Sequence, residues 1–314
     1  MPQLSPSQAR LIDPILSSVA QGFQNSAFVG GLLFPTVGVA ARGGRILSFG
    51  KEAFMLYTNT QRAPGENTKR IQVGFQGSPF SLLDYSLESS VPRELLEEAS
   101  AVPGIDLASA SIKVVSDALD LRLEKQQADL ARNPANYSAN NKITLSGTFQ
   151  WSDFGTTSDP VAVVEAAREA IRTSTGKRPN TMVIGAAVMA KLKQHPKVVD
   201  RMKYTGRDIA TTELLQSLFD IARVVIGDGI YALDDGTFVD VWGKDVVLAY
   251  TELSSLANMG TPSYGYTYTL DGYPMVEEPY YDPNAKTWFY PYTRVEAPVI
   301  AGASAGFLIA NAVA

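Results

Sequence analysis

A serine-centred string near the end of the chain is the part of this sequence that most resembles a catalytic motif. Gly302-Ala303-Ser304-Ala305-Gly306 matches the G-x-S-x-G nucleophile elbow. That mechanism needs an acid and then a histidine later in the chain, and neither follows Ser304. The only histidine, His195, comes earlier and is followed by Pro196. We therefore expect no hydrolase, and we expect His195 to be a solvated residue at a helix boundary.

A glycine-containing string in the middle of the chain resembles a cofactor-binding motif. Residues 227–232 match the relaxed G-x-G-x-x-A dinucleotide fingerprint, which needs a helix N-terminus to receive a pyrophosphate. Asp234-Asp235 and strand-forming residues follow instead, which predicts that these glycines serve a hairpin. The three aspartates Asp228, Asp234 and Asp235 do not have the spacing of a calcium-binding loop. Because the chain also contains no cysteine, the sequence predicts no catalytic, cofactor-binding or metal-ligating residue.

Two other residue groups keep a carbohydrate-related function open as an alternative. Paired glutamates could act as the acid and base of a glycosidase, namely Glu94, Glu97 and Glu98, or Glu277 and Glu278. Solvated charge on a loop or helix end is the commoner role of such neighbours. The tyrosine-rich stretch at residues 264–292 could stack on sugars in a binding module, although aromatic residues more often pack a sheet or a subunit interface.

Composition and charge limit the classes of partner. The 314 residues are 45% hydrophobic, enough for one or two cores. The net charge is -5, but residues 1–75 carry seven positive and three negative side chains, which gives +4 there and -9 elsewhere. A mildly basic arm on an acidic body favours contacts with acidic neighbouring surfaces over nucleic-acid recognition. No secretion signal is recognised at the start of the chain.

The uncharged residues 297–314 raise the question of a membrane anchor. Their length suits a minimal span, but Pro298 and Asn311 oppose insertion and no basic residue flanks them. We expect a buried strand and a packed terminal tail instead, with no membrane contact.

The strongest local pattern is a long amphipathic helix at residues 106–132. Five apolar residues are spaced by three, four, four and seven, which places them on one helical face: Ile112, Val115, Leu119, Leu123 and Leu130. Asp106 is a suitable N-cap, and Asn133-Pro134 ends the pattern. The helix would be about 40 Å long at 1.5 Å per residue.

The residues before this helix are expected to form an arm and a projecting hairpin. Short apolar clusters broken by Pro14 and Pro35 predict an extended N-terminal segment. A turn at residues 62–67 precedes alternating apolar residues, which predicts half of a hairpin that lies on another surface. The expected contact residues are Arg62, Pro64, Gly65, Lys69, Arg70, Ile71, Val73 and Phe75. We also expect apolar side chains of the arm and loop to be buried on neighbouring subunits, namely Phe28, Phe34, Phe75 and Phe80.

The second half of the chain predicts a compact α+β lobe. Asp159-Pro160 begins a helix that stops near Gly176, and the residues from 181 to about 255 alternate short strands and short helices.

Taken in order, these elements resemble the major capsid proteins of tailed bacteriophages with the HK97-type fold. Several local strings are similar to those of one capsid-protein group: Arg62-Ala63-Pro64-Gly65, Asn133-Pro134-Ala135-Asn136-Tyr137, Leu145-Ser146-Gly147, Trp151-Ser152-Asp153, Arg178-Pro179-Asn180-Thr181, His195-Pro196, Lys203-Tyr204-Thr205-Gly206 and Trp242-Gly243-Lys244-Asp245. The resemblance covers nearly the whole chain.

The resemblance implies a domain plan. Residues 1–50 would be the N-arm, 51–90 the extended E-loop and 91–180 the peripheral domain, whose spine helix is 106–132. Residues 181–255 would be the axial domain, and 256–314 would return to the peripheral domain and form the C-terminal tail.

The resemblance also implies a function. The chain would be a structural protein rather than an enzyme, would need no cofactor, and would form hexamers and pentamers of an icosahedral shell around double-stranded DNA, which it would contact nonspecifically. Its partners would be its own copies, a separate scaffolding protein, the portal and decoration proteins. It would assemble in the host bacterial cytoplasm and reside in the virion capsid. An encapsulin-like cargo shell of the same fold is the related alternative.

Overall fold

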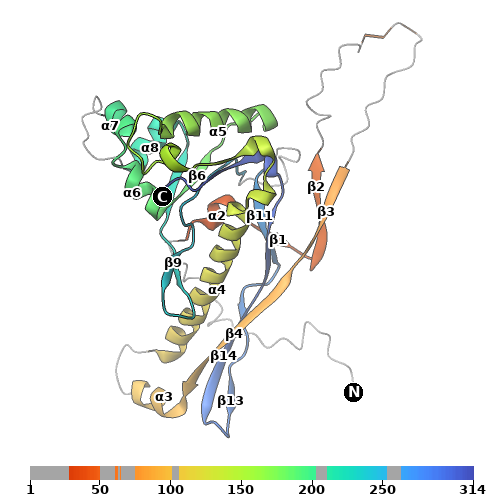
Figure 1. Cartoon of the computed structure of the whole chain (residues 1–314). Coiled ribbons are helices and arrows are strands. Elements are labelled where there is room, and N and C mark those ends of the chain that lie inside the picture. Colours follow the sequence, from red (N-terminus) through yellow and green to blue (C-terminus); the bar gives the residue numbers. More distant parts are fainter. Residues whose placement is uncertain are drawn as a thin grey trace.

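The computed structural model describes residues 28–49, 61–62, 64, 75–100, 106–202, 211–252 and 263–314. Within these ranges the fold is α+β, as the sequence predicts. The molecule is elongated, with a compact lobe at one end of a long sheet and a long helix (Figure 1).

A five-stranded sheet forms the centre of the compact lobe. Its strands follow the order β5 (Lys142–Thr144), β15 (Gly306–Ala310), β10 (Val246–Ala249), β6 (Thr181–Gly185) and β7 (Arg223–Gly227). Strand β10 is antiparallel to β15 and β6, whereas β5 and β7 pair in parallel with their neighbours. Strands β6, β10 and β15 are buried along their whole length, which explains why their sequences are almost continuously apolar.

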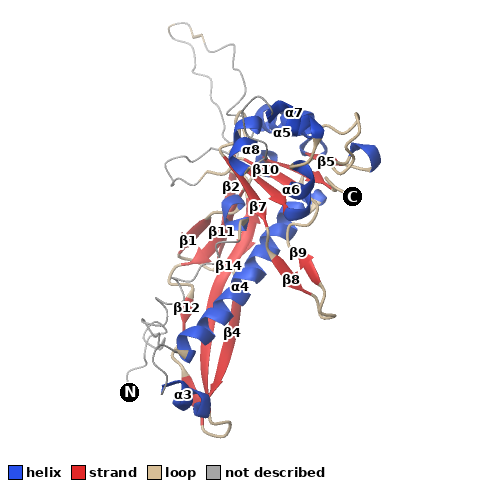
Figure 2. Ribbon diagram, turned by 90° about the vertical axis from the view of Figure 1, so that its left-hand side faces the viewer, coloured by secondary structure: helices blue, strands red, loops and turns tan. Residues whose placement is uncertain are grey.

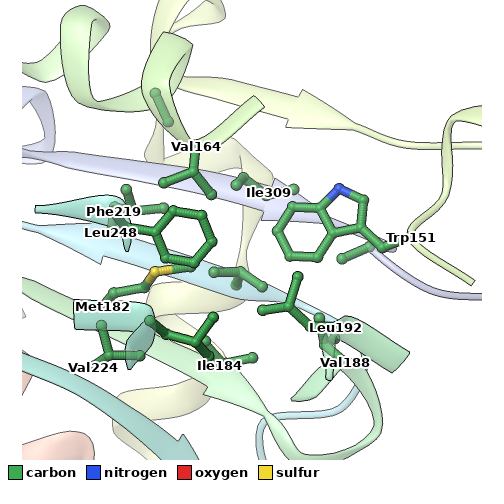
Figure 3. Packing of buried hydrophobic residues seen from close by; sticks show 14 of the residues in the cluster. Trp151, Val164, Met182, Ile184, Val188, Leu192, Phe219, Val224, Leu248 and Ile309 are labelled. Carbon is green, nitrogen blue, oxygen red and sulfur yellow. The ribbon is translucent and has the colours of Figure 1, made fainter. Parts of the chain in front are cut away.

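Four helices pack around this sheet: α5 (Pro160–Thr175), α6 (Ala186–Leu192), α7 (Pro196–Met202) and α8 (Thr212–Phe219). The Asp159 carboxylate accepts a hydrogen bond of 3.0 Å from the Ala162 N–H, and Gly176 ends α5 with a φ of 71°. Trp151, Val164 and Phe219 meet in the core between helices and sheet (Figure 3). The caps predicted for α5 are therefore confirmed.

The division of the chain between the two parts differs from the expected one. Strand β5 and helix α5 precede residue 181, and β15 lies within residues 256–314, yet all three belong to the compact lobe. The pairing of β15 with β10, from Val246 opposite Ile309 to Ala249 opposite Gly306, makes this sheet continuous. Sequence patterns predicted β15 as a buried strand but could not identify its partner, because pairing joins residues far apart in the chain.

The elongated part is built on strand β14 (Thr287–Ile300). The whole of strand β4 (Leu83–Pro92) pairs with β14, from Thr287 opposite Pro92 to Glu296 opposite Leu83. The remaining strands of this six-stranded sheet are β11 (Gly265–Leu270), β12 (Met275–Val276), β13 (Tyr280–Asp282) and β1 (Thr36–Val39), which pairs in parallel with β11. Helix α3 (Arg93–Ser100) follows β4 at the far end (Figure 1).

The predicted long helix is present as α4 (Leu107–Arg132), with 26 residues. The Asp106 carboxylate accepts hydrogen bonds from the N–H groups of Ala108 and Ser109, at 3.0 and 3.2 Å. Figure 2 shows that α4 runs beside β4 and β14 toward the compact lobe. Its boundaries match the expected ones because both end signals are local.

Only part of the expected apolar face of α4 is fully buried. Ile112, Val115 and Leu119 pack in one cluster with residues of β4, β12 and β14, whereas Leu123 and Leu130 are half-buried. Farther along the helix the buried positions are Glu124, Gln127, Ala128 and Ala131. The buried face of α4 therefore changes along its length, because the helix packs first against the long sheet and then against the compact lobe.

Two small ribbons and one short helix complete the described fold. Strands β2 (Gly43–Phe49) and β3 (Phe75–Ser81) form one ribbon, and β8 (Ile230–Ala232) and β9 (Phe238–Asp240) form the other. The short helix is α2 (Gly30–Leu33). Single 3-10 turns occur at Pro134–Asn136, Ala139–Asn141, Gly147–Phe149 and Ala303–Ala305.

Candidate assembly surfaces

The β2–β3 ribbon projects from the body of the molecule (Figure 1). Its strands pair only with each other among the described strands, from Gly43 opposite Ser81 to Phe49 opposite Phe75. At its base, Arg42 binds the Asp84 carboxylate at 2.5 Å, and the Phe80 ring stacks on Tyr268 with 4.4 Å between centroids. The ribbon is thus anchored at one end, and its outer strand edges pair with no other described strand.

The structure places only some of the expected contact residues of this loop. Arg62 and Pro64 are exposed, and Phe75 begins β3. The other five, Gly65, Lys69, Arg70, Ile71 and Val73, lie outside the described residues. Their contact role stays a prediction.

A buried carboxylate on α4 holds the start of the described chain. Glu124 is 2% exposed and accepts hydrogen bonds from the N–H groups of Val29 and Gly30 at 3.0 and 2.8 Å, and from Trp242 Nε1 at 2.6 Å. A Cβ at Gly30 would collide with the Gln127 side chain, so glycine is needed for this close approach. Burial raises the pKa of Glu124, and the three donors oppose that rise. Sequence reasoning missed this residue.

The segment around Phe34 is part of the subunit's own core. Phe34 is fully buried, its ring lies 5.4 Å from that of Tyr264, and its carbonyl accepts a hydrogen bond from Thr267. Phe28 and Phe80 are half-buried within the same chain. The expectation that Phe34 is buried on a neighbour is therefore wrong, because β1 joins the long sheet beside β11 and carries the preceding residues inward.

An ion-pair network fixes α4 to the long sheet. Arg122 binds Glu296 at 2.5 Å and lies over the Tyr85 ring, 3.3 Å from its centroid. Arg294 on β14 binds Asp120 at 2.7 Å. Burial raises the pKa of Glu296 and of Asp120, and the neighbouring arginines oppose that rise. These charged groups pair with one another inside the subunit, which favours a structural role over catalysis.

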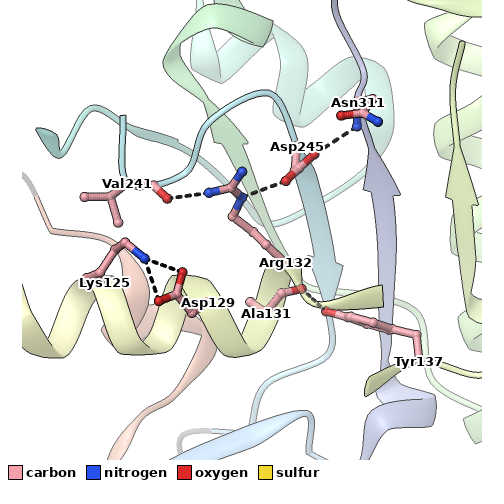
Figure 4. A network of polar contacts seen from close by, with 8 residues as sticks. All are labelled: Lys125, Asp129, Ala131, Arg132, Tyr137, Val241, Asp245 and Asn311. Carbon is pink, nitrogen blue, oxygen red and sulfur yellow. Dashed lines mark hydrogen bonds and ion pairs between the residues drawn. The ribbon is translucent and has the colours of Figure 1, made fainter. Parts of the chain in front are cut away.

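A second network joins the end of α4 to the compact lobe (Figure 4). Arg132 donates to Asp245 at 2.6 Å and to the Val241 carbonyl at 2.9 Å, while the other Asp245 oxygen accepts from the Asn311 N–H at 2.9 Å. The Tyr137 hydroxyl donates to the Ala131 carbonyl at 2.6 Å. The helix, strand β10 and the C-terminal strand are therefore coupled through a few polar side chains.

The far end of the elongated part carries aromatic side chains. Tyr280 stacks on Phe289 and is 48% exposed, and Tyr281 lies 5.3 Å from Trp288. An open pocket of about 640 Å³ lies between this aromatic group and α3; it is lined by Arg93, Leu96, Glu97, Pro279, Tyr281, Trp288 and Tyr290. Other tyrosines of the same stretch, such as Tyr264 and Tyr292, are buried in the fold, which favours sheet packing over a sugar-stacking platform.

The candidate catalytic strings have structural roles. The Ser304 carbonyl accepts hydrogen bonds from the side chains of Asn141 and Ser174, so the backbone of this serine has a structural role. His195 is fully buried beside Ser158, 3.2 Å from its hydroxyl, and burial lowers the pKa of the imidazole. The expectation of a solvated His195 is wrong, because the turn before α7 packs beneath the loop that leads into α5.

The glycine string and the acidic groups also lack a catalytic arrangement. Strand β8 follows Gly227 and Gly229, so no helix N-terminus receives a phosphate there. Glu94, Glu97 and Glu98 are exposed on α3. Among the described residues no group of three or more histidine or acidic side chains could hold a metal ion. Nor does any helix in the same ranges have the length and apolar character needed to span a membrane.

Comparison with known proteins gives the class. A family model described as phage major capsid protein E matches residues 136–290. The major capsid protein of Burkholderia phage BcepMu is 40% identical, over 97% of this chain and 98% of that protein. A crystal structure of a phage-related protein from Bordetella bronchiseptica RB50 has a TM-score of 0.82 and 44% identity, covering 97% of this chain and 98% of that one.

More distant structures share the fold alone. The capsid structure of cyanophage P-SCSP1u has a TM-score of 0.57 at 12% identity, covering 92% of this chain and 89% of that one. The fold is therefore that of HK97-type shell proteins, as the sequence resemblance predicts. The chain belongs to the family of phage major capsid proteins. These relatives give no support to a cargo shell, an enzyme or a sugar-binding module as its function.

Proposed function

We propose that copies of this chain form hexamers and pentamers, which close into an icosahedral shell around double-stranded DNA. The observation that carries the proposal is the β2–β3 ribbon, which projects from the body with both strand edges unpaired among the described strands. An isolated two-stranded ribbon is marginally stable in water, so a neighbouring surface is needed to hold it. The major capsid proteins among the relatives support the same role.

In this proposal the division of labour follows the two parts of the molecule. The compact lobe surrounds the axis of each hexamer or pentamer. The elongated part, with α4 as its spine, reaches outward to neighbouring capsomers. The loop at residues 51–90 makes the inter-subunit contact through Arg62, Pro64, Gly65, Lys69, Arg70, Ile71, Val73 and Phe75. The residues Ile112, Val115 and Leu119 keep the spine on its sheet, and Leu130 packs farther along against the compact lobe.

The proposed partners follow from the same role. A scaffolding protein guides assembly in the host bacterial cytoplasm, the portal occupies one vertex, and decoration proteins bind the finished shell. Contact with DNA is nonspecific, because the net charge is -5 and the basic residues are not clustered in a recognition motif.

Sedimentation and electron microscopy of the purified chain, alone and with its scaffolding protein, test the proposal. We expect closed particles with sixfold and fivefold clusters of subunits. A monomer under all of these conditions would contradict it.

A further inference from the structure

We propose that the β8–β9 ribbon of one copy is the docking site for the basic residues 45–75 of a second copy. The inference rests on the proposed shell function and names the surface on which the projecting loop lies. It follows from the two faces of the ribbon, from its charge, and from its position on the molecule.

The two faces of the β8–β9 ribbon differ in burial. Tyr231 and Val239 are partners across the strands and lie on the inner face, where Lys125 of α4 stands 5.3 Å from the centre of the Tyr231 ring. Both are half-buried. On the outer face, Ile230 is 51% exposed and Phe238 is 71% exposed. Such apolar side chains, left uncovered on a ribbon whose other face is packed, mark an interaction surface.

The shape of the ribbon is set before any partner binds. At its base, the Val241 N–H donates to the Gly229 carbonyl at 2.8 Å. At its tip, the Asp235 carboxylate accepts hydrogen bonds of 2.8 Å from the Thr237 N–H and 2.6 Å from its hydroxyl. A preformed surface loses little conformational freedom on binding, which favours a stable contact.

The charges of the ribbon and of the proposed occupant are complementary. Residues 228–240 contain four aspartates, Asp228, Asp234, Asp235 and Asp240, and no lysine or arginine. Residues 45–75 contain five positive side chains, Arg45, Lys51, Arg62, Lys69 and Arg70, against Glu52 and Glu66, which gives +3. Complementary charge fixes the register of a contact and rejects wrong partners.

The positions of the two surfaces allow a ring of copies. The β2–β3 ribbon leaves one side of the body, whereas β8–β9 lies on the opposite side, beside α4 (Figure 1). A contact between two different surfaces on opposite sides joins copies head to tail, and such contacts close into rings when the rotation permits. Each copy in a ring would then give its loop to one neighbour and receive a loop from the other.

Zero-length cross-linking of assembled particles tests the docking site in the unaltered chain. A carbodiimide joins carboxylates to lysines without a spacer, and tryptic cleavage after Arg223 and Lys244 isolates the whole ribbon in one peptide. Particles are built from a mixture of isotope-labelled and unlabelled copies. We expect this peptide to be linked to Lys51 or Lys69 of a differently labelled copy, in particles but not in unassembled subunits.

The outcomes separate the two proposals. Three results would overturn the docking site. The ribbon carboxylates could be unlinked in the particles, linked between copies only to lysines outside 45–75, or linked to another protein of the particle. Each of these results would leave the shell function standing. Failure to form particles under any condition would contradict the shell function and, with it, the docking site.

Charge reversal gives an independent test with a matched control. Asp228→Lys with Asp234→Lys spares the Asp235 turn, and we expect it to lower the particle yield about tenfold through like-charge repulsion. Adding Lys69→Asp and Arg70→Asp should restore most of the yield. The control is Glu94→Lys with Glu98→Lys, an equal charge change on exposed α3 residues. Unchanged particle yield in the first variant would overturn the proposal. An equal gain in yield when Lys69→Asp and Arg70→Asp are added to the control variant would also overturn it.

Discussion

The Glu124 carboxylate accepts a 2.6 Å hydrogen bond from Trp242 Nε1, although 118 positions separate the two residues in the chain. The other Glu124 contacts hold the backbone at Val29 and Gly30. One side chain of the spine helix therefore joins the start of the described chain to the compact lobe.

Glu124→Ala should destabilise the subunit by about 3 kcal/mol, because three buried donors lose a charged acceptor. Urea unfolding of the unassembled subunit measures the change. Hydrogen exchange should show faster exchange of the Val29 and Gly30 amides. Glu169→Ala is the control, since the ion pair of Glu169 with Arg172 is exposed and its loss should leave stability nearly unchanged. Equal stability of the two variants would show that the Glu124 contacts are weak.

The raised pKa of Glu124 gives its contribution a defined pH dependence. The Glu124 carboxylate binds its proton more tightly in the folded state than in the unfolded state, where a glutamate has a pKa of about 4.3. Stability from this group is therefore fully present below that value and is lost as pH rises through the raised folded-state pKa. The stability of the natural chain minus that of Glu124→Gln should increase as pH falls from about 7 to about 4. A difference that stays constant or decreases in this titration would argue against the raised pKa.

Leu119→Lys should cost about 3 kcal/mol or more, because it places an unpaired charge in the cluster between α4 and the long sheet. Leu119 is 2% exposed, whereas Val114 on the same helix is 68% exposed. Val114→Lys is therefore the matched control and should leave the melting temperature almost unchanged. Similar melting temperatures for both variants would contradict the assigned buried face.

Arg132→Ala should destabilise the junction of helix and lobe by about 2 kcal/mol, because Asp245 is left nearly buried without its cation. The loss should be accompanied by faster exchange of the Asn311 N–H, which binds the same carboxylate. Arg172→Ala, which removes an exposed ion pair, provides the comparison. If Asn311 stays protected in Arg132→Ala, the network does not couple the helix to the C-terminal strand.

Local signals predicted the elements well. The caps Asp106 and Asp159 and the stop at Asn133-Pro134 act within a few residues, so the sequence revealed the bounds of α4 and the start of α5. The alternation of short strands and helices predicted from residue 181 begins with the buried strand β6, for the same reason.

Long-range contacts could not be predicted in this way. Nothing near Glu124 in the sequence indicates that it meets Trp242, and nothing near His195 indicates that it packs beside Ser158. The inward course of the chain at Phe34 depends on the pairing of β1 with β11, which joins residues far apart in sequence. For a shell subunit the difficulty is greater, because parts of the surface are completed only by other copies.

Deletion of residues 62–75 tests most directly the claim that the projecting loop makes this chain a shell subunit. The compact lobe should stay folded, which the fluorescence of the buried Trp151 and Trp242 reports. Sedimentation of the deletion variant and the natural chain side by side should show closed particles only for the natural chain. Normal particles from the deletion variant would contradict the account.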